Sequence, residues 1–139
     1  MKDDEAGSAL IESVLLGLLF LVPTLWAVVL LADVHRGALA TTAAAREAGF
    51  EAVRWDDRAS AARAVDGAVE MALENHGLDP TRARVVLTAS GLARGSAVEV
   101  GISYPVRLFR LPLIGGDIGP SLWIRARHVA RIDPYRSES

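Results

Sequence analysis

The sequence predicts an α+β protein in which one long amino-terminal helix precedes a small mixed domain. Residues 14–32 contain no charged side chain and consist mainly of leucine, valine and alanine, which predicts an apolar helix. After residue 80 the chain instead alternates apolar and polar residues, with the two-residue period of half-buried strands. We therefore expect a transmembrane helix that extends into a small domain with a second helix and about three antiparallel strands.

The apolar segment has the length that a membrane requires. Its nineteen residues rise by about 28 Å as a helix, close to the roughly 30 Å hydrocarbon core of a bilayer. Pro23 should bend this helix or open one turn without ending it, because membrane helices tolerate an interior proline. The helix can continue to about residue 53 with one apolar or small-residue stripe: Val34, Leu39, Ala43, Ala44, Ala48 and Val53.

A second helix is expected within residues 55–77. Asp56 or Asp57 can cap its start, and Gly77 is well placed to end it. Its apolar residues recur at helical spacing and form a modest face: Ala62, Val65, Val69, Ala72 and Leu73.

Three segments have the pattern of strands: residues 83–90, 97–106 and 121–133. We expect a turn at residues 91–96, an irregular apolar connection at 107–120 and a loose tail at 133–139. The middle strand places Val98, Val100, Ile102 and Tyr104 on one face. In the last strand Leu122, Ile124, Ala126, Ala130 and Ile132 alternate with Arg125, Arg127 and Arg131, so the arginine face should be solvated or face a partner. A small sheet with one apolar face needs helices to cover it.

Several kinds of chemistry find no support in the sequence. The net charge is −2 without a basic stripe, which is unlike a nucleic-acid-binding protein. The absence of cysteine excludes disulfides and thiolate sites, and His35, His76 and His128 are too scattered to suggest a metal site. The glycine-rich IGGDIG lacks the lysine of a phosphate loop. We expect no enzymatic activity, cofactor, metal or small-molecule substrate.

Glu12 is the residue that most needs an explanation. A carboxylate at membrane depth is unfavourable, and no residue within one helical turn of Glu12 carries a positive charge. Its partner must come from elsewhere, unless the side chain simply reaches up to the interface.

The stretch GSALIE, followed by the apolar helix, resembles the class III signal of type IV pilins and pseudopilins. This resemblance implies that a prepilin peptidase cuts between Gly7 and Ser8. Glu12 then becomes the fifth residue of the mature chain. In that family the glutamate is thought to pair with the free α-amine of an adjacent subunit, which satisfies both charges only on assembly.

The order of the later segments is similar to that of TadE-like proteins of the tight-adherence (Flp) pilus system. The matching segments are AAAREAGFEAV, VEVGISYPVRLFRLPL and SLWIRARHVARIDPYRS. The resemblance implies a leader at residues 1–7, a transmembrane and assembly helix at 8–32, and an extracytoplasmic domain at 33–139. It further implies a minor pseudopilin of the cytoplasmic membrane whose partners are the prepilin peptidase, other pilins, the inner-membrane assembly platform and lipid.

Other readings remain open at this stage. Lys2 precedes the apolar helix and Arg36 and Arg46 follow it, so the positive-inside rule alone favours a domain on the cytoplasmic side. The chain could be an uncut, single-pass anchor for an interaction domain. The small residues Ala38 and Ala40 also fit ordinary signal peptidase, which would release a secreted domain starting at Thr41.

Overall fold

The computed structural model describes residues 2–55, 57–89, 96–108 and 119–132, with side chains from Ser8 onward. The chain forms two compact units, Met1–Asp33 and Val34–Ser139. A long apolar helix, a second helix and a three-stranded antiparallel sheet confirm the predicted α+β class. Most of the predicted turn at 91–96, most of the predicted connection at 107–120 and the predicted tail at 133–139 lie outside the described residues.

Helix α1 (Lys2–Ala52) is continuous, and Pro23 lies inside it, so the prediction that this proline does not end the helix is confirmed. A proline at this position has no N–H to donate to the carbonyl of Leu19. Polar side chains along the apolar part bond to the helix itself. The Ser13 hydroxyl donates to the Ala9 carbonyl at 2.8 Å, and the Thr24 hydroxyl donates to that of Phe20 at 2.7 Å.

The second helix, α2 (Arg58–Asn75), is capped at both ends. Asp57, rather than Asp56, is the N-cap residue, and its carboxylate accepts from the Ser60 backbone N–H at 2.8 Å. At the other end Gly77 adopts φ 68°, and Leu78 N–H donates to the Leu73 carbonyl at 3.0 Å. This pattern is the glycine-dependent C-cap that the sequence predicted. The buried residues are Ala61, Val65, Val69, Ala72 and Leu73, so Ala61 replaces the predicted Ala62.

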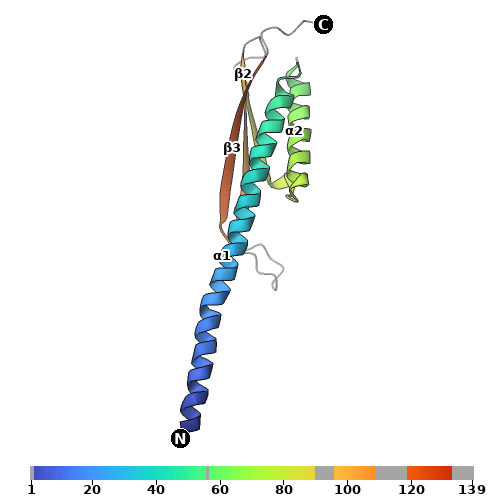
Figure 1. The fold of residues 1–139 in the computed structure, drawn as a ribbon. Coiled ribbons are helices and arrows are strands. Elements are labelled where there is room, and N and C mark those ends of the chain that lie inside the picture. The colour runs from blue at the N-terminus through green and yellow to red at the C-terminus, as the bar shows by residue number, and fades with distance from the viewer. Residues whose placement is uncertain (1, 56, 90–95, 109–118, 133–139) are drawn as a thin grey trace. The chain divides into compact units, whose positions relative to one another are not determined.

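The sheet has the strand order β1-β2-β3, with β1 (Arg84–Ala89), β2 (Ala97–Arg107) and β3 (Ser121–Arg131) all antiparallel to their neighbours. A short 3₁₀ helix, η1 (Pro80–Arg82), precedes β1. The predicted apolar face of β2 is buried: Val98, Val100, Ile102 and Tyr104. From Trp123 onward the odd-numbered residues of β3 are exposed and the even-numbered ones are less so, as in a half-buried strand, but Leu122 of the predicted apolar face is 45% exposed, so its predicted burial is wrong. Figure 1 shows α1, α2 and the sheet.

The predicted stripe on the second half of α1 is partly wrong. Ala44 and Ala48 are buried, but Leu39 is 52% exposed. The residues that face the core are the small ones, in rows four apart: Gly37, Thr41, Ala45 and Gly49, and Ala40, Ala44, Ala48 and Ala52. A Cβ added at Gly37 would lie only 2.8 Å from Val106 Cγ2 and 3.0 Å from Ile124 Cδ1. The helix approaches the sheet too closely at this point for a larger side chain, which is why small residues rather than large apolar ones occupy the contact.

Candidate membrane and assembly segment

The first part of α1 exposes an unusually large apolar surface. Among the described residues one helix, Ser8–Ala52, is long and apolar enough to cross a membrane by length and composition. The most apolar 18-residue stretch of this helix is not buried at all, unlike the core helix of a soluble protein. A signal sequence near the N-terminus would meet the same criteria of length and composition. Leu10, Phe20 and Leu31 are each about 70% exposed. Soluble monomers rarely expose so large a continuous apolar patch, so this segment is suited to lipid or to other apolar helices.

All four residues that the sequence singles out lie on α1: Gly7, Ser8, Glu12 and Pro23. Glu12 is exposed, and within the described part of the chain no cation lies at ion-pair distance from it. The side chains one turn away, Ser8 and Leu16, carry no charge that could pair with it. The described residues therefore supply no counter-charge to this carboxylate.

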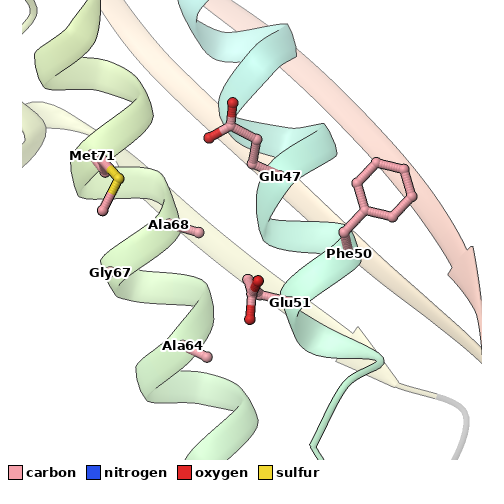
Figure 2. A pocket seen from close by; sticks show the side chains of 7 residues that line it. All are labelled: Glu47, Phe50, Glu51, Ala64, Gly67, Ala68 and Met71. Carbon is pink, nitrogen blue, oxygen red and sulfur yellow. The ribbon is translucent and has the colours of Figure 1, made fainter.

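A shallow apolar groove lies between α1 and α2, as Figure 2 shows. Its volume is about 510 Å³, and it is lined by Glu47, Phe50, Glu51, Ala64, Gly67, Ala68 and Met71. Sequence reasoning missed this groove. The signal in the sequence was that Phe50 and Met71 fall outside the apolar stripes predicted for the two helices, and the structure leaves them 51% and 63% exposed.

Phe50 belongs to a cluster that joins α1 to the sheet. Its ring centroid lies 5.6 Å from that of His128, and the guanidinium of Arg46 lies 5.7 Å from the ring. A Cβ at Gly49 would overlap the His128 ring, so this glycine lets the helix approach β3. Glu51 on the groove wall accepts a hydrogen bond from Arg54 at 2.8 Å. These contacts are structural, and they leave the Phe50 side chain half exposed.

The predicted arginine face of β3 is exposed. Arg125, Arg127 and Arg131 point away from the helices. Arg127 Nε lies 3.3 Å from Glu99 Oε1 on β2, and the Arg84 guanidinium of β1 lies 4.4 Å from the Trp123 ring centroid. Both contacts cross between strands on the outer face of the sheet, so this face is basic with a few apolar side chains among the charges.

The structure does not bring the three histidines together. His35 lies on α1, His76 caps α2 and His128 lies on β3. Groups of three or more metal-binding side chains are absent from the described residues. The perturbed carboxyl groups that can be identified are structural: hydrogen bonds from Ser60 lower the pKa of Asp57, and hydrogen bonds from Thr81 lower the pKa of Asp79.

Comparisons with known protein families, with curated proteins and with solved structures found no match.

Proposed function

We propose that this protein is a minor pseudopilin of a tight-adherence (Flp) type pilus or a related secretion system. A prepilin peptidase would remove residues 1–7, and the mature helix would assemble with other pilins at the inner-membrane platform. The domain would then lie outside the cytoplasmic membrane. This is an assembly function without turnover of a substrate.

One observation carries the proposal: Glu12 is an exposed carboxylate with no cation at ion-pair distance among the described residues, on a helix whose other exposed side chains are mostly large and apolar. A charge in such surroundings is costly unless a partner supplies the opposite charge. Cleavage after Gly7 would create that opposite charge, the α-amine of Ser8, about one helical turn from Glu12, so that a neighbouring subunit shifted by about 6 Å along the helix axis would bring the two groups to one depth. Assembly would satisfy both groups, while neither is satisfied in the separate subunit.

The first experiment is the intact mass and amino-terminal sequence of the protein from native membranes. We expect the protein from native membranes to start at Ser8. Replacement of Gly7→Leu should block this processing, because the protease must hold a small residue at the cut. A chain that still starts at Met1 in the unmodified protein would contradict the cleavage assignment.

The second experiment separates processing from assembly. Glu12→Ala should leave the start at Ser8 unchanged and reduce recovery of the protein in sheared pili or cross-linked pilin complexes. Ser13→Ala is the matched control, because it alters the neighbouring position on the same helix without changing charge. Equal assembly of the Glu12→Ala protein and the control would remove the charge-pairing argument.

An uncut membrane anchor carrying an interaction domain is the second candidate. The groove between α1 and α2 favours it, since the groove exposes Phe50 and Met71 to a partner without any need for processing. A start at Met1 would support this reading. Release of a secreted domain at Thr41 is disfavoured, because cleavage there would separate the buried residues Gly37 and Ala40 from the core that they pack against.

A further inference from the structure

The hydrogen bonds of β3 show which of its backbone groups face away from the sheet. Ile132 N–H donates to the Ser96 carbonyl at 3.0 Å, and Leu108 N–H donates to the Pro120 carbonyl at 3.2 Å. Both bonds continue the register that pairs Val98 with Ala130. In an antiparallel pair the hydrogen-bonded positions alternate, so the even-numbered residues of β3 bond to β2. The odd-numbered residues direct their N–H and C=O groups to the free edge: Ser121, Trp123, Arg125, Arg127, Val129 and Arg131.

This edge is long, and no strand of the described residues lies beside it. The strand order ends at β3, and none of the six odd-numbered residues has a backbone partner on that side in the described part of the chain. Figure 1 shows β3 as an outer strand of the sheet. A free edge of this length is a template for pairing with another extended chain, and proteins usually shorten or cover such edges.

The side chains of the same residues determine which strand could pair here. Arg125, Arg127 and Arg131 lie on the outer face beside this edge. Arg127 forms an ion pair with Glu99, whereas Arg125 and Arg131 have no carboxylate at ion-pair distance among the described residues. Trp123 and Val129 lie on the same face and remain 38% and 53% exposed. An edge that only repelled other strands would not need an exposed tryptophan beside Arg125 or an exposed valine between Arg127 and Arg131.

A second copy of β3 fits this edge poorly. If two β3 strands paired antiparallel about any residue from 125 to 129, at least one arginine would face an arginine directly. Like charges directly opposite each other are destabilising in a sheet. The other strands of the chain do not supply the missing charge either, since β1 has no carboxylate and Glu99 is the only one on β2.

We propose that the free edge of β3 binds an extended, acidic segment of another protein as a fourth strand of the sheet. The backbone of this segment bonds to the odd-numbered residues of β3. Its outward side chains are carboxylates opposite Arg125, Arg127 and Arg131, and apolar residues opposite Trp123 and Val129. This mode of recognition takes affinity from the main chain and specificity from alternate side chains. It depends neither on cleavage after Gly7 nor on the partner of Glu12.

The test uses the full-length protein in detergent micelles and the labelled peptide Glu-Thr-Val-Thr-Glu-Thr-Glu-Thr-Val, whose odd positions match Arg131 to Trp123 in antiparallel order. The control is Glu-Glu-Glu-Thr-Thr-Thr-Thr-Val-Val, which has the same composition and charge. Fluorescence anisotropy should show that the patterned peptide binds at least about tenfold more tightly, because three charge pairs and two apolar pairs form only in the correct order. Amide hydrogen exchange should slow at Arg125, Arg127 and Val129. Equal binding of the two peptides would overturn the proposal.

Two further changes separate strand pairing from simple charge attraction. N-methylation of the patterned peptide at the amides that face β3 should abolish binding to the unmodified protein, so this arm does not depend on how any variant folds. Val129→Pro removes an N–H that faces the free edge and leaves the bonds to β2 in place, and it should weaken binding to the level of the control peptide.

Charge is tested with matched reversals. Arg125→Glu should weaken binding of the patterned peptide by about tenfold or more, whereas Arg58→Glu on α2 carries the same charge change and should have little effect. Vesicles rich in phosphatidylserine provide the alternative ligand. If these vesicles displace the peptide and the amides of β3 show no protection, the arginines bind anionic surfaces and the strand-pairing proposal is wrong.

Discussion

Gly37 is the position where the contact between α1 and the sheet can be tested most directly. A methyl group at this position would lie 2.8 Å from Val106 Cγ2 and 3.0 Å from Ile124 Cδ1. Carbon atoms in favourable contact are about 3.5–4.0 Å apart, so the neighbours must move by roughly half an ångström or more. Val106 is buried and only 6% exposed, which leaves it little room to move. We therefore expect Gly37→Ala to overpack the core.

Two opposing effects determine the size of the change. Overpacking a well-packed core costs about 1–3 kcal/mol. Replacing glycine by alanine inside a helix stabilises it by about 1 kcal/mol. The expected net effect of Gly37→Ala is thus a loss of about 0–2 kcal/mol in the free energy of unfolding. Gly67→Ala on α2 is the matched control, because a Cβ there meets nothing within 4 Å. It should stabilise the protein by about 1 kcal/mol.

The assay is urea unfolding of the full-length variants in detergent, followed by circular dichroism. The free energies of unfolding of the two glycine variants should differ by about 1–3 kcal/mol. This is the cost of overpacking alone, because both variants gain the same stability from replacing glycine by alanine in a helix. In a Val106→Ala background Gly37→Ala should cost less than it does in the unmodified protein, since the closest methyl group is absent, and this double-mutant cycle isolates the overpacking from the cost of Val106→Ala itself. If Gly37→Ala stabilises the protein as much as Gly67→Ala does, the close approach of α1 to the sheet is wrong.

Further predictions concern the core, the surface and pH. Leu73→Ala should lower the free energy of unfolding by about 2–5 kcal/mol in the same assay, because Leu73 is fully buried. Arg127→Ala should lower it by less than about 1 kcal/mol, since the Arg127 and Glu99 side chains are 71% and 41% exposed. Hydrogen bonds from Ser60 and Thr81 lower the pKa values of Asp57 and Asp79 from the ordinary 3.8, so their contribution is complete above that pH and is lost as the pH falls through the lowered values. Asp57→Asn should therefore reduce the acid sensitivity of the melting temperature below about pH 4.

Much of the fold could be predicted from the sequence because each element has a periodic signal of its own. The two-residue alternation of β2 correctly indicated its buried face, and the helical spacing of Val65, Val69 and Leu73 correctly indicated that of α2. Asp57 and Gly77 have side-chain or backbone properties that suit helix ends in any context, so both caps were predictable. The continuation of α1 past Pro23 was predictable because the apolar pattern continues on both sides of this residue, whereas the predicted bend or open turn stays a prediction.

The contact face of α1 could not be predicted because its residues are small. Alanine, glycine and threonine carry little hydropathic signal, so Leu39 seemed a better candidate for burial than Gly37 or Thr41. Which side of the helix is buried depends instead on how closely the sheet approaches, and this is a tertiary property. The groove beside Phe50 and the free edge of β3 could not be predicted for the same reason. The residue pattern within one segment does not specify which other segments pack beside it.

The two parts of α1 therefore differ in side-chain size for a physical reason. Where the helix meets the folded sheet, large side chains would clash with strands that cannot move, so only small residues fit. The first part carries large apolar side chains such as Leu10, Phe20 and Leu31, all exposed. Such side chains suit surroundings that can adapt to their shape, as lipid chains or the flexible side chains of neighbouring helices do. This change from large to small residues along one helix is what joins a segment suited to a membrane by length and composition to a folded domain. Under the proposed function, Glu12 would be the one charge within this apolar contact and would define how neighbouring helices align.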